Sequence, residues 1–212
     1  MSTSIQQLLA GAGEGLAQAP CYFDAWVRRH AGARLGELQL LYAAKNGFLA
    51  FDRALRVFPA IPPAHPLSLN GWNKPRLWRD TYGSLADGLL FFADDIFGGQ
   101  FCLKDSKVFV FEPETGAIEW LADDLDGWAA MMLAETDLYT GRPMALAWQD
   151  KFGTLDPAQR LIPTLLFTLG GEFTVDNLVA KDAVTGMRIR GPIAQQIHDL
   201  PDGTQIQFVI KD

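Results

Sequence analysis

The residues whose chemistry stands out most are nine carboxylates between positions 88 and 126. The only cations in that segment are Lys104 and Lys107. Carboxylates at this density could act as a pair in glycoside hydrolysis, bind Mg²⁺ or Ca²⁺, or recognise a basic partner. The nine are Asp94, Asp95, Asp105, Glu112, Glu114, Glu119, Asp123, Asp124 and Asp126.

Spacing argues against the first two of these roles. The calcium-loop pattern D-x-[DN]-x-[DN]-G is absent from the segment. Asp94 and Asp95 are adjacent, so on a strand their side chains would face opposite ways and could not work together on one ligand. Recognition of a basic partner is therefore the favoured role, and the alternative is that the acids are solvated turns that keep the protein soluble.

The histidines and cysteines show no spacing typical of a metal site or of an activated nucleophile. His30, His65 and His198 are scattered, and the pair formed by His198 and the next aspartate lacks further ligands nearby. Cys21 and Cys102 lie far apart, and Cys102 sits in an apolar strand pattern typical of an inert buried thiol. No P-loop, GxGxxG or GxSxG motif is present. We expect no catalytic residue, no cofactor and no metal.

The charge distribution narrows the partner further. The net charge is −7, and the segment 88–126 alone carries −7, whereas residues 1–87 carry +3 and residues 127–212 carry −3. An acidic field repels nucleic acid and attracts cationic surfaces, which excludes direct nucleic-acid binding. No apolar run approaches the roughly 18 residues of a membrane span, and Glu14 interrupts the weak signal-like start. We expect a cytoplasmic protein that does not contact membranes.

The spacing of apolar residues changes at Gly88, from a helical period before it to an extended pattern after it. The acids are therefore expected on strands and on the turns between them. Strands are predicted near residues 89–93, 100–104, 107–112 and 117–121, joined by short turns, as an antiparallel meander. The run Val108 to Phe111 is entirely apolar, which predicts a central strand buried on both faces.

Helices are predicted before and after this meander, without regular β-α alternation, so the fold class is α+β with a single domain. Asn46-Gly47 interrupts residues 37–59, which predicts two helical pieces, or one helix followed by an irregular segment. The remaining expectations are a short helix within 1–18, a helix capped by Asp123 or Asp124, a strand and turn within 160–173, a mostly helical passage at 174–200 broken at Gly186 and Gly191, and a final strand after the turn at 201–203.

One longer stretch of the sequence resembles a known protein family. The stretch "FFADDIFGGQFCLKDSKVFVFEPETGAIEWLADDLDGWA", preceded by "WRDTYG", resembles the bacterial Smi/Knr-type branch of the SUKH superfamily. Its turn at 112–116 reads E-P-E-T-G, where that branch commonly has D-P-[ED]-T-G. The resemblance is clearest over 78–135 and extends from about Tyr42 to the end, with residues 1–40 as an N-terminal helical extension. It implies one α+β domain over 1–212, with helices packed on a central sheet.

For bacterial members the resemblance implies an immunity protein, which binds a polymorphic toxin and neutralises it. Such toxins are often nucleases or nucleic-acid-modifying enzymes, whose basic clefts suit an acidic partner. A regulatory scaffold without a toxin partner, as for the eukaryotic relatives, is the alternative, and an uncharacterised enzyme comes third. The residues expected to reach solvent and bind the partner are Asp94, Asp95, Glu112, Glu114, Glu119 and Asp123.

Overall fold

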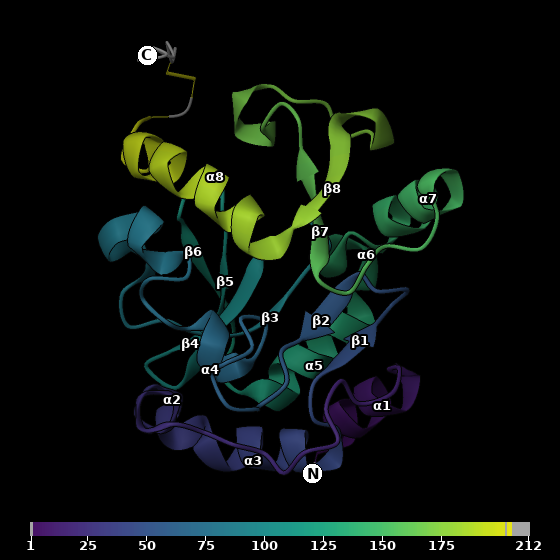
Figure 1. The fold of residues 1–212 in the computed structure, drawn as a ribbon, viewed down its shortest axis with the longest axis vertical. Helices are drawn as coiled ribbons and strands as arrows, with labels where there is room; N and C mark the ends of the chain where they lie inside the picture. The colour runs from purple at the N-terminus through teal and green to yellow at the C-terminus, as the bar shows by residue number, and fades with distance from the viewer. Residues whose placement is uncertain (1, 202, 205–212) are drawn as a thin grey trace.

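The centre of the molecule is a six-stranded antiparallel sheet, shown in the computed structural model, which describes residues 2–201, 203 and 204 (Figure 1). The strands follow one another across the sheet in chain order, as in a meander. They are β1 Phe48–Ala50, β2 Leu55–Val57, β3 Leu90–Asp94, β4 Gln100–Lys104, β5 Lys107–Phe111 and β6 Ile118–Ala122. A separate antiparallel pair, β7 Gln159–Pro163 and β8 Leu178–Asp182, lies beside it.

Helices cover both faces of the main sheet. Phe91 and Phe92 are neighbours on β3 and point to opposite faces: Phe91 contacts Trp78, which precedes the 3-10 segment η2, while Phe92 contacts Trp128 of α5. The helices are α1 Thr3–Gly11, α2 Ala25–Ala31, α3 Leu35–Ala44, α4 Leu69–Trp72, α5 Leu125–Ala134, α6 Thr136–Thr140, α7 Arg142–Phe152 and α8 Ala183–Ile197, with 3-10 segments η1 Gly32–Arg34, η2 Arg79–Ala86, η3 Phe167–Leu169 and η4 Val175–Asn177. The predicted α+β class is confirmed.

The predicted meander is confirmed as β3 to β6, and Asp124 caps α5 by accepting a hydrogen bond from Gly127 N–H at 2.8 Å. The expectation that β5 is buried on both faces is wrong, because Phe109 and Val110 are only half-buried. Strand β3 is buried at all five positions and lies at the middle of the sheet, next to β2, which is also buried throughout. Since β5 is next to the edge strand β6, the helices cover it less completely.

The second helical piece predicted after Asn46-Gly47 is a β-hairpin instead. Its turn holds three consecutive residues in the left-handed region, Phe51, Asp52 and Arg53, with φ of 52°, 57° and 72°. No glycine marks this turn, so the sequence carries no hairpin signature there. The outer edge of β1 is covered by the N-terminal segment, where Gly13 N–H donates to the carbonyl of Leu49 at 2.8 Å.

The C-terminal passage also differs from its prediction. Strand β8 precedes α8, and α8 runs without a break through Gly186 and Gly191. Gly191 permits close packing, because a Cβ there would lie 2.3 Å from the hydroxyl of Thr81. The strand predicted at 205–210 lies outside the described residues. In the part of the chain that is described, no helix is both long enough and apolar enough to cross a membrane.

The described residues form two apolar cores. The larger is shared by both faces of the main sheet, helices α1 to α5 and α8, and the smaller lies between α7 and the β7–β8 pair. The smaller core is tied to the sheet by the Leu161 N–H, which donates to the carbonyl of Ile96 at 2.8 Å. The loop after β3 therefore lies at the junction of the main sheet and the β7–β8 pair, and the turn between β5 and β6 lies at the same end of the antiparallel strands.

Candidate functional site

Asp94 belongs to a buried ion cluster and is not part of the surface. Its carboxylate is 0% exposed and accepts from Arg56 Nε of β2 at 3.0 Å and from an Arg160 nitrogen of β7 at 2.6 Å. Both guanidinium groups are also buried. The expectation that Asp94 reaches solvent is therefore wrong, because Arg56 from the neighbouring strand β2 and Arg160 from β7 both contact it at the end of β3.

Glu114 is likewise buried, against the expectation, and has a structural role. Its carboxylate accepts from the backbone N–H and the hydroxyl of Thr168, both at 2.9 Å, and from the Phe167 N–H at 3.3 Å. These N–H groups begin the 3-10 segment η3 and have no partner within it. Glu114 therefore fastens the loop after β7 to the turn between β5 and β6.

Glu119 and Asp123 are exposed, as expected, at the β6 edge of the main sheet. Asp123 forms a solvent-exposed ion pair of 2.9 Å with Lys107, which lowers the pKa of Asp123. Between the two acids, Trp120 leaves 59% of its surface exposed. Exposed tryptophans are often important in protein–protein contacts, and the sequence pattern did not single out Trp120.

The remaining two predicted residues, Asp95 and Glu112, line one cavity of about 400 Å³, which we call the acidic cleft. The loop after β3, the turn after β5, helices α6 and α8 and the loop after β7 all contribute to its walls. Asp137 of α6 adds a third carboxylate, and Glu114 lies in the wall. The structure thus brings acids from three separate turns and helices together.

The geometry around Asp95 is built by the turn D-I-F-G-G. Its Oδ1 accepts from the N–H groups of Phe97 and Gly99, both at 2.8 Å. Gly99 allows this close approach, because a Cβ there would lie 2.4 Å from Asp95 Oδ2. Burial, reinforced by the negative charge of Glu112, raises the pKa of Asp95 to about 8. Near neutral pH this carboxyl therefore holds a proton, which it can lose when a cation approaches.

Arg190 of α8 is the cation in the wall of the cleft. The residue is 1% exposed and donates to the carbonyls of Phe97 at 2.7 Å and Gly186 at 3.0 Å. None of the ion pairs found among the described residues includes Arg190. Its charge is satisfied mainly by backbone carbonyls, so the acids of the cleft are not neutralised by a direct contact with it.

Aromatic rings form the apolar side of the cleft. Phe97, Phe167 and Phe173 contact one another with ring centroids 5.2–5.7 Å apart. Phe173 is 60% exposed, and Leu138 of α6 is 73% exposed at the same cavity. Exposed large apolar side chains beside a cavity are typical of protein-binding sites. They come from segments far apart in the chain, and only Phe97 lay within a motif that sequence analysis used.

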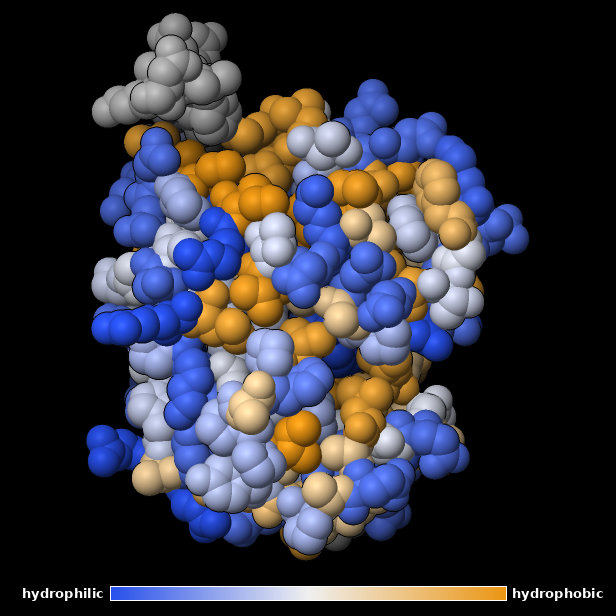
Figure 2. All heavy atoms as spheres, viewed as in Figure 1, coloured by the Kyte–Doolittle hydropathy of each residue, from blue (hydrophilic) through white to orange (hydrophobic). Residues whose placement is uncertain are grey.

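The surface near α8 and β8 is more apolar than the rest of the same face. Figure 2 shows apolar residues gathered over the half of the molecule that holds α8 and the β7–β8 pair, while the opposite half is mostly hydrophilic. Val179 of β8 and Ile189 of α8 are among the exposed apolar residues there. The half of the molecule that contributes Arg190 to the cleft therefore also exposes apolar surface.

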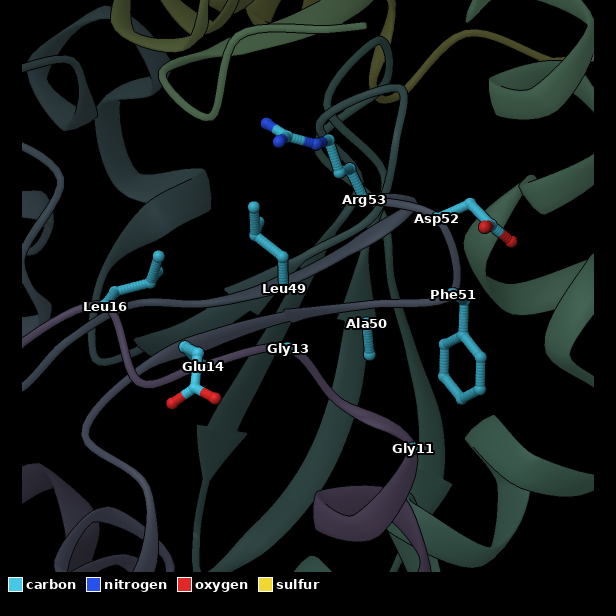
Figure 3. A pocket seen from close by; sticks show the side chains of 9 residues that line it. All are labelled: Gly11, Gly13, Glu14, Leu16, Leu49, Ala50, Phe51, Asp52 and Arg53. Carbon is cyan, nitrogen blue, oxygen red and sulfur yellow. The ribbon is translucent and has the colours of Figure 1, made fainter.

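A different cavity, of about 330 Å³, lies where residues 11–16 run along the β1–β2 hairpin (Figure 3). Figure 3 shows Arg53 and Leu49 pointing to one side of this hairpin and Phe51 to the other. The polar side chains of its turn are already used: Asp52 binds Arg142 at 2.7 Å, and Arg53 donates to a backbone carbonyl. This cavity is therefore a packing gap between the N-terminal segment and the hairpin. No cluster of three or more potential metal ligands occurs in the described residues.

No family model matches the sequence, and no curated protein matches it. Among solved structures, the chain is similar to the crystal structure of Atu4351 from Agrobacterium tumefaciens. The TM-score is 0.54 at 14% identity, and the match covers 91% of this chain and 89% of the other. The two proteins therefore share a fold over nearly their whole length, and the likeness extends to the fold alone.

Proposed function

We propose that the protein is an immunity protein, which binds a cognate polymorphic toxin and neutralises it. The observation that carries the proposal is the acidic cleft, in which Asp95, Glu112 and Asp137 lie beside the exposed side chains of Leu138 and Phe173. The resemblance of residues 78–135 to the Smi/Knr-type branch of the SUKH superfamily supports it independently. The proposal places the protein in the cytoplasm and gives it no catalytic role.

The acidic cleft and the apolar side chains beside it would together complement the surface of a basic enzyme. A toxin that acts on nucleic acid needs cationic residues around its active site, since its substrate is a polyanion. Acids speed the encounter with such a surface above a neutral baseline of about 10⁵–10⁶ M⁻¹s⁻¹. Apolar side chains at the centre of a contact contribute most of the affinity, which is the role we assign to Leu138 and Phe173.

The experiment is expression of the gene product encoded next to this protein, alone and together with it. We expect that product to arrest growth, and this protein to restore growth and form a stable complex with it. The double variant Leu138→Asp and Phe173→Ser should lose protection while keeping its circular dichroism spectrum. The matched control is Leu40→Asp on α3, which changes a 54% exposed leucine elsewhere and should still protect.

A non-toxic neighbour, or a toxic neighbour whose effect this protein does not relieve, would count against the proposal. Either result would favour a regulatory scaffold that uses the same surface for another protein.

A further inference from the structure

We propose that the acidic cleft is the socket for one cationic side chain, a lysine or an arginine, that projects from the partner protein. The inference rests on the proposed function only for the origin of that side chain. The chemistry of the socket is argued from the cleft itself and can be tested without a toxin.

The size of the cleft suits a single side chain. Its volume of about 400 Å³ is in the lower part of the range of small-ligand sites, roughly 300–1,000 Å³. A folded helix or a strand pair would need a longer groove, whereas one long side chain with its flanking backbone fits. Leu138 and Phe173, exposed at the same cavity, are placed to contact the residues on either side of it.

The lining suits an amphipathic cation in particular. Lysine and arginine have an apolar stem and a charged head, and they bury the stem against apolar surface. The rings of Phe167 and Phe173 offer such surface, and a cation near a ring face is also favoured electrostatically. The charged head would then lie among the carboxylates of Asp95, Glu112 and Asp137.

Other occupants fit less well. An apolar side chain would cover the exposed carboxylates of Glu112 and Asp137 without offering them a hydrogen bond, which costs free energy. An anion would be repelled, because the carboxylates of Glu112, Glu114 and Asp137 line the cleft against the single guanidinium of Arg190. A metal ion is not favoured either, since no ligand cluster was found in the residues that the structure describes.

Occupation should be linked to pH through Asp95. The groups that act on it are Asp94 at the end of β3, Glu112 and Glu114 in the turn after β5, Asp137 on α6 and Arg190 on α8. Burial and the charge of Glu112 favour a proton on Asp95, and an entering cation favours its release to solvent. Affinity for a cation should therefore rise as the pH rises from 6.5 to 8.5.

The test uses N-acetyl-L-arginine N-methylamide as the probe, titrated into ¹⁵N-labelled protein and followed by NMR. We expect saturable shifts of the amide signals of Phe97, Gly99 and Gly141, with affinity roughly tenfold higher at pH 8.5 than at 6.5. The citrulline analogue, which has nearly the same shape and no charge, should produce no such shifts. Equal binding of both compounds, or arginine shifts confined to other surfaces, would overturn the proposal.

Two variants separate the socket from a general effect of charge. Asp95→Asn keeps an oxygen for the Phe97 and Gly99 N–H groups, so it should fold, and its affinity for the probe should lose the dependence on pH. Asp137→Asn changes an exposed residue of α6 and should weaken the probe several-fold at every pH. The control Glu119→Gln removes an exposed charge from the β6 edge and should change neither the affinity for the probe nor its pH dependence. Unaltered probe binding in both Asp95→Asn and Asp137→Asn would also overturn the proposal.

The outcomes distinguish this inference from the proposed function. Probe binding without protection against any toxin would leave the socket standing and reject the immunity role. Protection without probe binding would support the immunity role and reject the socket. The β6 edge around Trp120 would then be the next candidate for the contact surface.

Discussion

At the scale of single residues, burial divides carboxylates that look alike in the sequence. Asp94 and Asp95 are neighbours, yet Asp94 is locked between two arginines while Asp95 faces a cavity. The arginines that bury Asp94 lie 38 and 66 residues away in the chain. Local pattern identified both as acids near a strand end, but their roles depend on contacts that only the tertiary fold creates.

The first prediction concerns the ion cluster. Asp94→Asn should lower the free energy of unfolding by about 3–5 kcal/mol, because it leaves Arg56 and Arg160 buried without a carboxylate. Urea unfolding at pH 7 measures the change. The control Glu119→Gln, at an exposed position, should stay within about 0.5 kcal/mol of the parent protein. Equal stability of the two variants would show that the cluster contributes nothing to folding.

The second prediction is a dependence of stability on pH through Asp95. Its pKa is about 8 in the folded protein, against an ordinary value of 3.8, so the folded state holds a proton that the unfolded state has released. The contribution to stability is fully present below about pH 4 and is lost as the pH rises towards 8. Asp95→Asn should flatten the fall in melting temperature between pH 5 and pH 8. A variant with the same pH profile as the parent would contradict the prediction.

At the scale of elements, strands joined by turns with a local sequence signal could be predicted, whereas elements that depend on long-range packing could not. The strands β3 to β6 follow from alternating apolar runs and short turns, whose signals lie within a few residues of each other. The β1–β2 hairpin turns through Phe51, Asp52 and Arg53, residues that give no turn signal of this kind. In α8, Gly191 looks like a break but is a place of close packing against Thr81, a residue distant in sequence.

The same limit applied to the acidic cleft. Asp95 and Glu112 were expected from charge density, but Asp137, Leu138 and Phe173 were not, because they join the site only when α6 and the loop after β7 fold against the sheet. A partner site assembled from several turns has no single sequence signature.

The third prediction concerns the loop that forms the aromatic wall. Glu114→Ala removes the acceptor for the N–H groups of Phe167 and Thr168, so this loop should detach more often. Hydrogen exchange at these two amides should accelerate by about tenfold or more, the equivalent of one lost charged hydrogen bond. Exchange in β3 should stay the same. Glu172→Ala, at an exposed position of the same loop, is the matched control and should leave both amides protected.

At the scale of the whole molecule, the distribution of charge matters more than its total. Of the six acids predicted to bind the partner, Glu112, Glu119 and Asp123 are exposed, and they lie in the turn between β5 and β6 and along the β6 edge. The Debye length is about 8–10 Å in physiological salt and longer at low salt, where the fields of separate exposed charges add up and steer a partner over a longer range. Since the core does not contain these carboxylates, their replacement tests recognition apart from folding.

The last prediction follows from that separation. Replacing all three of these acids with lysine should leave the melting temperature nearly unchanged and slow association with the proposed toxin partner by about tenfold or more at low salt. The control replaces Glu14, Asp87 and Asp150, exposed acids of the N-terminal segment, the η2–β3 connection and α7, and so makes the same change in net charge. Stopped-flow measurements across ionic strengths compare the two proteins. If steering arises from the β5–β6 side, only the first variant loses the acceleration at low salt; if both lose it equally, net charge alone guides the encounter and this surface has no special part in it.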